Sequence, residues 1–550
     1  MNHFLAPRRP VDASAPGAGP THTRSVKRPM RIRRTALLVG ALGVLATGCQ
    51  DFLDVNENPN APQRVAANLY LPPMLHWMAM SPQWDGRYIG PYTQQFATTT
   101  ISNWMRMGYV PGSDAGGEVW RATYWMFGQN LIDMMEIAER EERWDLLGVG
   151  HILKAWGWKS ATMLHGEIII TEAFDQSKLT FNYDSEELAN QVVRAHLDSA
   201  ITLLQRTDGA VDAGYLGRGD KVYNGEREKW LKFAYGMLAM HLNHYSNKAS
   251  YDPAAVIAAV NQSFASPADD AQASYPNTQN DDINFLGRSR GNFTTYRQGQ
   301  FIVQLMDGTA TGVEDPRMTR MLSPAPDGDY RGLDINISGF GGLPTNQQPN
   351  NPYGYPGTGG LGAPGLYLFD DRALMPIMTY AQLQFIKAEA ALRMGDQATA
   401  HDAYVKGIEG HIDFVNSNVR NVENGFTYEP ISATERAAFL ADPAIVPAVG
   451  SLTLTHVMTQ KYIAQWAWGH LELWMDMRRF NYTDTDPATG TQVYTGFALP
   501  TNLYVDNAGK PVYRLRPRYN SEYVWNQEGL DAIGGLAADY HTKPLWIIQP

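Results

Sequence analysis

The feature that most constrains this chain is its single cysteine, Cys49, together with the residues that precede it. With one cysteine in 550 residues no intramolecular disulfide can form, so core packing must stabilise the fold. Cys49 follows a basic start (Arg31, Arg33, Arg34) and an apolar run over residues 36–46. A charged start, a short apolar run and a small-residue cleavage site are typical of a secretory signal. We therefore expect residues 30–48 to be a signal peptide.

The position of the cysteine directly after the small residues resembles a bacterial lipoprotein box. In such boxes the cysteine is acylated, for example with palmitate, and becomes the mature N-terminus. Ala46 departs from that pattern, which usually has Leu three residues before the cysteine. Two acyl chains anchor a protein stably where one does not. We expect Cys49 to be lipidated and residues 49–62 to form a tether, with an ordinary signal-peptidase site and a chance cysteine as the alternative.

The segment before this signal, residues 1–29, is rich in Pro, Ala, Gly and Arg and has no apolar periodicity. A start at Met30 would give a compact basic region, so we interpret residues 1–29 as a mis-called extension. A long disordered region ahead of the signal is the alternative. In both cases the segment is left out of fold reasoning.

The charge of the chain excludes one class of partner. The formal net charge is −11, and many of the basic residues lie in the N-terminal segment, which makes the mature part more acidic still. Nucleic-acid binding needs a basic footprint, so nucleic acid is not expected as a partner. No second apolar run approaches the roughly 20 residues that span a bilayer. The mature protein is therefore expected to be anchored to a membrane by its lipid without spanning it.

Apolar residues recur at helical spacing in most of the remaining chain. The pattern predicts helices over residues 94–107, 117–135, 148–164, 188–205, 228–245, 380–394, 397–417 and 455–480. The alanine-rich helices on either side of Gly395-Asp396 are typical of a tetratricopeptide hairpin. Residues 263–376 are rich in Gly, Pro and Asn and are expected to form a loop-rich ligand or partner region.

The predicted fold class is mainly α, with tetratricopeptide-like helix pairs, long irregular loops and a few short strands in a single large domain. That domain would cover residues 63–550, and residues 380–480 would supply its clearest tetratricopeptide-like helices.

Several motifs, in order along the chain, resemble the SusD/RagB family of outer-membrane lipoproteins. They are Asp51-Phe52-Leu53-Asp54 after the signal, Tyr183-Asp184, Tyr223-Asn224-Gly225 with Lys229-Trp230, Phe385 with Ala388-Glu389-Ala390, Trp474 with Asp476 and Arg478-Arg479, and Pro517-Arg518-Tyr519 with Glu522 and Asn526. The segment from Gly166 to Ala173 departs from the family pattern because it lacks a Pro-Tyr pair.

The resemblance implies a surface-exposed lipoprotein of the outer membrane, facing the cell exterior. Such a protein captures a nutrient, commonly a glycan and in some members a peptide. It would act as a lid on a SusC-like TonB-dependent transporter and deliver the ligand into it. Neither catalysis nor a cofactor is implied.

The aromatic residues, 11% of the chain, supply the candidate ligand site. Trp and Tyr offer an apolar face with a polar tip, which suits sugar or peptide recognition. In the family, aromatics from the early segment and the mid-chain loops often form the site. The candidates are Trp84, Arg87, Tyr88, Asn103, Trp104, Arg106, Tyr353 and Tyr355. The alternative for each aromatic is a place in the core or in a protein interface.

Other charged clusters have structural interpretations. Glu472, Asp476, Arg478 and Arg479 are expected to form ion pairs and not an acid–base site, as is Glu389. Asp327, Asp329 and Asp334 could hold a structural calcium ion, although turn residues explain them as well and their spacing does not fit an EF-hand.

The leading function is oligosaccharide binding for uptake. Peptide binding, a lipid-anchored hydrolase and a purely structural partner of the transporter are the alternatives.

Overall fold

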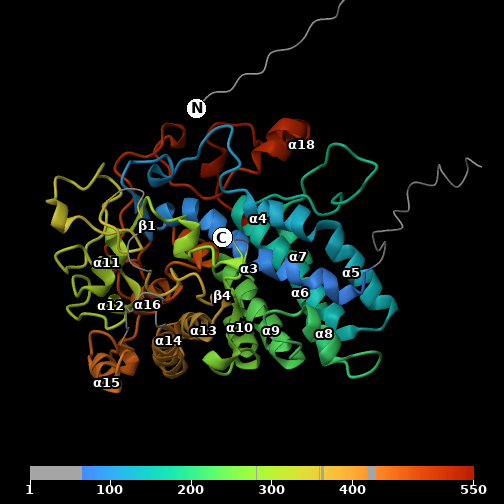
Figure 1. The fold of residues 1–550 in the computed structure, drawn as a ribbon, viewed down its shortest axis with the longest axis horizontal. Coiled ribbons are helices and arrows are strands. Elements are labelled where there is room, and N and C mark those ends of the chain that lie inside the picture. Colours follow the sequence, from blue (N-terminus) through green and yellow to red (C-terminus); the bar gives the residue numbers. More distant parts are fainter. Residues whose placement is uncertain (1–64, 280–281, 358–359, 361–364, 419–428) are drawn as a thin grey trace, which may run out of the picture. The chain divides into compact units, whose positions relative to one another are not determined.

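Pairs of helices, each packed on the next, make up most of the computed structural model (Figure 1). The model describes residues 65–279, 282–357, 360, 365–418 and 429–550, of which Ala66–Pro550 form one compact unit. The predicted signal, Cys49 and the tether lie outside the described residues. The pairs are α6 (Trp144–His165) with α7 (Glu186–Leu204), α9 (Arg227–His244) with α10 (Pro253–Gln262), α13 (Tyr380–Met394) with α14 (Gln397–Asn418), and α16 (Leu454–Gln465) with α17 (His470–Arg479).

Local sequence signals set the start of α7 and the boundary between α13 and α14 where they were expected. The Ser185 hydroxyl accepts a hydrogen bond from the Leu188 N–H at the start of α7. Gly395 ends α13 in the left-handed conformation, and α14 begins two residues later. The predicted fold class, mainly α with tetratricopeptide-like pairs in a single domain, is confirmed. No helix in the described part of the chain has the length and apolar character to cross a bilayer.

Further helices and two short strand pairs complete the fold. The helices are α3 (Leu71–Tyr92), α4 (Glu118–Arg121), α5 (Gly128–Arg140), α8 (Ala213–Gly219), α11 (Gln300–Met306), α12 (Met318–Met321), α15 (Ala433–Ala441) and α18 (Gln527–Ala532). Strand β1 (Phe96–Thr98) pairs antiparallel with β3 (Tyr296–Gln298), and β2 (Ala271–Ala273) pairs antiparallel with β4 (Met375–Met378). The β1–β3 pair joins the early segment to the loop-rich region, with Phe96 opposite Gln298.

The predicted helix over residues 94–107 is wrong; the helix of this region is α3. Its first turn carries Pro residues, whose missing N–H groups have no helical partner there in any case. Gly86 and Gly90 are sites of close packing within α3: a Cβ on Gly86 would lie 2.1 Å from the His470 ring. Gln94 adopts φ 58°, and the chain leaves α3 for strand β1.

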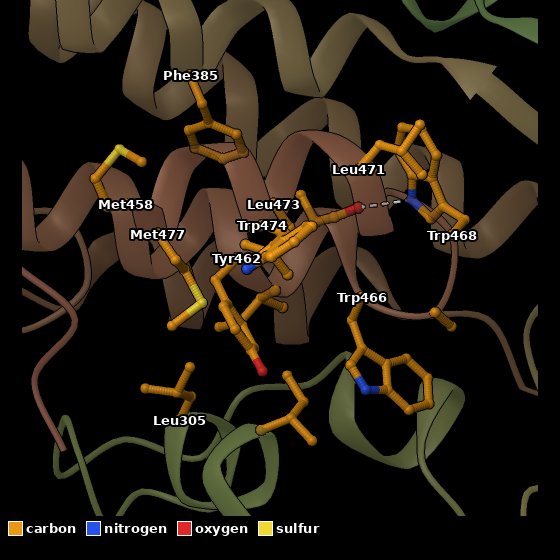
Figure 2. Packing of buried hydrophobic residues seen from close by; sticks show 14 of the residues in the cluster. Leu305, Phe385, Met458, Tyr462, Trp466, Trp468, Leu471, Leu473, Trp474 and Met477 are labelled. Carbon is orange, nitrogen blue, oxygen red and sulfur yellow. Dashed lines mark hydrogen bonds between the residues drawn. The ribbon is translucent and has the colours of Figure 1, made fainter. Parts of the chain in front are cut away.

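The single helix predicted over residues 455–480 is also wrong, because it breaks into α16 and α17. Ala467 in the break adopts φ 72°, and the turn places Trp466 in the core (Figure 2). There the Trp466 indole N–H donates to the Gln95 carbonyl at 3.3 Å, and the Ala467 N–H donates to the Gln95 side chain at 2.9 Å. A long-range contact thus overrides a helical pattern.

Candidate ligand-binding site

The C-terminal half of α3 presents Trp84, Arg87 and Tyr88 on one side of the helix. Their spacing of three and four residues makes them neighbours on a helix surface. The Arg87 guanidinium carbon lies 4.6 Å from the centre of the Trp84 ring and 5.5 Å from that of Tyr88. It also lies 5.4 Å from the ring of Phe285, which comes from the loop-rich region. The arrangement is a guanidinium held among aromatic rings.

A buried carboxylate fixes this part of α3 to its neighbour. The Asp85 carboxylate accepts hydrogen bonds from the backbone N–H groups of Glu118 at 3.0 Å and Val119 at 2.8 Å, at the start of α4. Burial raises the pKa of the Asp85 carboxyl to about 7, although these two hydrogen bonds and the Arg87 charge act in the opposite direction. The start of α4 is therefore held to the C-terminal half of α3.

Strand pairing adds Tyr296, at the start of β3, to this cluster. Its ring packs on Phe293 with centroids 5.0 Å apart. Burial raises the pKa of the Tyr296 hydroxyl to about 12, and the nearby Arg87 charge opposes that rise. Trp84, Arg87, Tyr88 and Tyr296 are each half-buried, above the buried Phe285. We call these residues the Arg87 shelf.

The polar groups at the ends of the aromatic side chains of the Arg87 shelf, which we call its polar tips, have no hydrogen-bond partners among the described residues. Within the described part of the chain, the Trp84 indole N–H and the hydroxyls of Tyr88 and Tyr296 make no hydrogen bond, and Arg87 has no carboxylate partner. Its one hydrogen bond, from Nε to the Trp84 carbonyl, is 3.5 Å long. Aromatic faces with free donors around a free guanidinium can stack on an apolar ring face and hydrogen-bond to hydroxyl or carbonyl oxygens at its edge.

Three early candidates remain. Trp104 borders the shelf, whereas the side chains of Asn103 and Arg106 donate hydrogen bonds to backbone carbonyls. Trp104 is 7% exposed and packs on Tyr88 with ring centroids 4.9 Å apart. The Asn103 side chain donates to the Tyr109 carbonyl at 2.9 Å. The Arg106 guanidinium donates to the Asn502 carbonyl at 3.0 Å and to a second carbonyl beside it. Asn103 and Arg106 thus tie their loop to the rest of the fold.

The loop candidates Tyr353 and Tyr355 do not join the shelf. Tyr353 is fully buried, and its hydroxyl donates to the Leu286 carbonyl at 3.1 Å. Its ring is therefore unavailable to a ligand in this conformation, and it supports the loop that carries Phe285. Tyr355 is half-buried in a turn where its N–H donates to Asn351 at 3.0 Å. Among the described residues, no hydrogen bond or ring contact joins Tyr355 to the shelf.

Two shelf residues were missed from the sequence, Phe285 and Tyr296. Both lie in the region predicted to carry ligand contacts, residues 263–376, but nothing local distinguishes them from Tyr353 and Tyr355 there. The strand pattern around Tyr296 is only three residues long, too short to stand out in a loop-rich segment.

The charged clusters behave as structural pairs. Arg479 binds both oxygens of Glu389, at 2.7 and 2.9 Å, and also Asp476 at 2.7 Å. Glu472 pairs with Lys159 and, at 2.8 Å, with His244. These contacts confirm the ion-pair interpretation of Glu389, Glu472, Asp476 and Arg479, whereas Arg478 donates to the carbonyls of Met163 and Tyr513 and has no acidic partner among the described residues.

The aspartates proposed for calcium have protein partners. Arg331 donates to Asp327 at 2.7 Å and to Asp329 at 2.5 Å, and Asp334 accepts the Asn336 N–H at 2.8 Å. Across the described residues, no group of three or more His, Cys, Asp or Glu side chains is placed to hold a metal ion.

Comparison with known proteins gives a family. The SusD-like family model, described as starch-binding and associating with the outer membrane, matches residues 59–502. No curated protein matches the chain.

Similar solved structures share the fold over 88% of this chain. A SusD/RagB family protein from Bacteroides thetaiotaomicron is 21% identical with a TM-score of 0.65, and 99% of its chain is covered. A SusD homolog from Bacteroides fragilis is 21% identical with a TM-score of 0.66, and 100% of its chain is covered. A chitin-binding SusD homolog from Flavobacterium johnsoniae is 20% identical with a TM-score of 0.61, and 98% of its chain is covered. The family match covers most of the sequence, and the chain therefore belongs to the SusD-like family.

Proposed function

We propose that this protein is a cell-surface lipoprotein that binds an oligosaccharide on the Arg87 shelf and passes it to a SusC-like TonB-dependent transporter of the outer membrane. Acylated Cys49 would anchor it, facing the exterior, beside that transporter. The protein would act by binding alone, without catalysis or a cofactor. The family description and the chitin-binding relative support a glycan as ligand.

The observation that carries the proposal is the set of unused polar tips on the shelf. In the core, by comparison, the Trp474 indole N–H donates to the Tyr482 hydroxyl at 2.7 Å, and the Tyr462 hydroxyl donates to the Thr93 carbonyl at 2.7 Å. The Trp144 indole N–H and the hydroxyls of Tyr275 and Tyr494 also lack a partner among the described residues, but these atoms are buried. The rings of Trp84, Tyr88 and Tyr296 instead present apolar faces with free donors at their edges. A pyranose ring has the complementary form, with apolar C–H faces and hydroxyls around its rim.

The charge of the shelf favours the same ligand class over a cationic one. Arg87 offers donors to ring and hydroxyl oxygens, whereas a lysine-rich peptide would meet a positive charge that has no salt-bridge partner among the described residues. An acidic peptide is compatible with Arg87, so a peptide ligand remains the second outcome of the experiment.

Titration calorimetry with starch-derived and chitin-derived oligosaccharides and with mixed peptides tests the proposal. We expect Trp84→Ala and Arg87→Ala each to weaken glycan binding about tenfold, since a ring stack or cation–π contact contributes on the order of 1 kcal/mol. Trp144→Ala is the matched control: Trp144 is half-buried beneath the Arg206 guanidinium at 3.9 Å, but Arg206 is paired with Asp208.

Binding of peptides alone would move the protein to the peptide-binding alternative. Cleavage of any titrated glycan by the isolated protein would overturn the binding assignment in favour of a hydrolase. Loss of affinity with Trp144→Ala equal to that with Trp84→Ala would remove the shelf as the site.

A further inference from the structure

A second aromatic hollow lies between the segment that follows α4 and the loop that follows α6. Its volume is about 400 Å³, within the size range of small-molecule sites. Tyr124, Trp125, Phe174 and Phe181 supply its aromatic walls, and Glu522 supplies an acidic one. None of these residues belongs to the Arg87 shelf.

Unusual backbone conformations hold two of the walls in place. Trp125 lies in a π-helical turn, Ala122–Phe127, and is 65% exposed. Phe174 has φ 68°, a left-handed conformation that is strained for an aromatic residue. π-helical turns and strained residues cluster at functional sites, because surrounding structure must hold them against their local preference.

One carboxylate oxygen of Glu522, the acidic wall, has no hydrogen-bond donor among the described residues. Glu522 is 5% exposed, and its Oε2 accepts hydrogen bonds from the Tyr183 hydroxyl at 2.7 Å and from the Asn526 side chain at 2.9 Å. Asn526 in turn accepts the Phe181 N–H at 2.9 Å, which links the carboxylate to an aromatic wall. No described residue donates to Glu522 Oε1, and Glu522 lines the hollow, so this oxygen is the acceptor that a ligand would reach.

The charges around the hollow leave Glu522 uncompensated. Two arginines also line the hollow: Arg121 is paired with Glu118 at 3.0 Å and lies over the Trp125 ring, 4.3 Å from its centre, and Arg518 is paired with Asp114 at 2.5 Å. Each arginine is therefore neutralised by its own partner. Glu522 has neutral donors only among the described residues. A buried carboxylate in this position favours a ligand that carries positive charge.

We propose that this hollow binds a primary ammonium ion carried on an apolar or aromatic group. The ammonium would donate to Glu522 Oε1 and lie against the aromatic faces, which attract cations electrostatically, while the group that carries it would fill the apolar volume. The Arg87 shelf has the opposite character, a cation without a carboxylate partner in the described part of the chain. The two sites therefore select different ligands, and this inference does not depend on the proposed glycan function.

Titration of the full chain with benzylammonium and with benzyl alcohol at the same pH and salt concentration tests the proposal. The two probes share a ring and differ in charge, so we expect benzylammonium to bind about tenfold more tightly. Trp125→Ala should weaken benzylammonium binding about tenfold, because it removes one aromatic wall. Trp525→Ala is the control: Trp525 is 75% exposed and does not line the hollow.

Glu522→Gln should abolish the preference for the ammonium probe while retaining some affinity for the alcohol. If that variant does not fold, the comparison of the two probes on the wild type and on Trp125→Ala decides the matter alone. Glucosamine serves as an amino-sugar probe: tighter binding than benzylammonium assigns the ammonium to a sugar, and weaker binding assigns it to an aromatic group. Equal affinity for benzylammonium and benzyl alcohol, or unchanged binding by Trp125→Ala, would overturn the proposal.

Discussion

Two sets of charged residues in this molecule differ in whether their charges are paired within the protein. In the core between the helix pairs, Arg479 binds Glu389 and Asp476, and Lys461 binds Asp476 at 2.9 Å. On the Arg87 shelf, the guanidinium lies among aromatic rings and has no carboxylate within the described part of the chain. The first set satisfies its charges internally, whereas the second leaves its donors for a ligand.

The difference follows from burial, which decides whether a charged side chain needs a partner in the protein. A buried pair is costly to desolvate, and it is tolerated only when every charge has partners. Glu389 meets that condition because Asn243 adds a hydrogen bond at 2.9 Å to those of Arg479. A half-buried guanidinium such as Arg87 can remain without a carboxylate because water still reaches it in the free protein.

The largest effect is expected from breaking the core set. Glu389→Gln leaves the buried Arg479 without its main partner, and the loss of one member of a buried pair costs about 3–5 kcal/mol. Urea unfolding followed by circular dichroism measures the change in the free energy of unfolding. A loss below about 1 kcal/mol would show that water or another group compensates Arg479.

Acid should weaken the same set. Burial alone would raise the pKa of the Glu389 carboxyl, but the charge and hydrogen bonds of Arg479 outweigh it and hold that pKa below its ordinary value. Ionised Glu389 therefore contributes stability that is present above the ordinary glutamate pKa of about 4.3 and is lost as the pH falls below it.

This contribution can be isolated by measuring the free energy of unfolding between pH 3 and pH 7 for the wild type and for Glu389→Gln. The difference between the two should shrink toward low pH. A difference that is constant with pH would contradict the assignment.

The shelf should respond in the reverse way, with affinity changed and stability kept. Arg87→Met retains apolar contact with the Trp84 ring but removes the donors, so we expect about tenfold weaker glycan binding and a change in unfolding free energy within about 0.5 kcal/mol. Calorimetry and urea unfolding of the same preparation measure both. A large loss of stability would make Arg87 a structural residue like Arg479.

The smallest effect is expected at an exposed pair. Lys406 and Asp402, one turn apart on α14, lie 2.8 Å from each other and are about half exposed. Such pairs contribute about 0–1 kcal/mol. Asp402→Asn should change the free energy of unfolding by less than about 0.5 kcal/mol and leave ligand affinity unchanged. A loss comparable to that of Glu389→Gln would mean that burial does not control the strength of pairing in this protein.

Much of the scaffold could be predicted because its signals are local. The Gly395-Asp396 break and the Ser185 cap lie within a few residues of the helices that they delimit. The predictions failed where distant residues decide the conformation. Gln95 holds the break beside Trp466, and His470 packs against Gly86 of α3. For the site, Trp84, Arg87 and Tyr88 were named from the sequence and lie together, whereas Tyr353 is buried and Tyr296 takes a place on the shelf.

The sequence by itself determined helix pairs such as α13–α14, the family resemblance and the absence of an intramolecular disulfide, because helical periodicity, caps and residue composition act over short distances along the chain. Only the tertiary structure decided which aromatic residues are exposed together. Exposure depends on packing between segments far apart in sequence, as when the β1–β3 pair brings Tyr296 to α3. The same is true of the hollow at Glu522. Tyr183 and Asn526 hold this carboxylate by hydrogen bonds, and aromatic rings line the hollow around it.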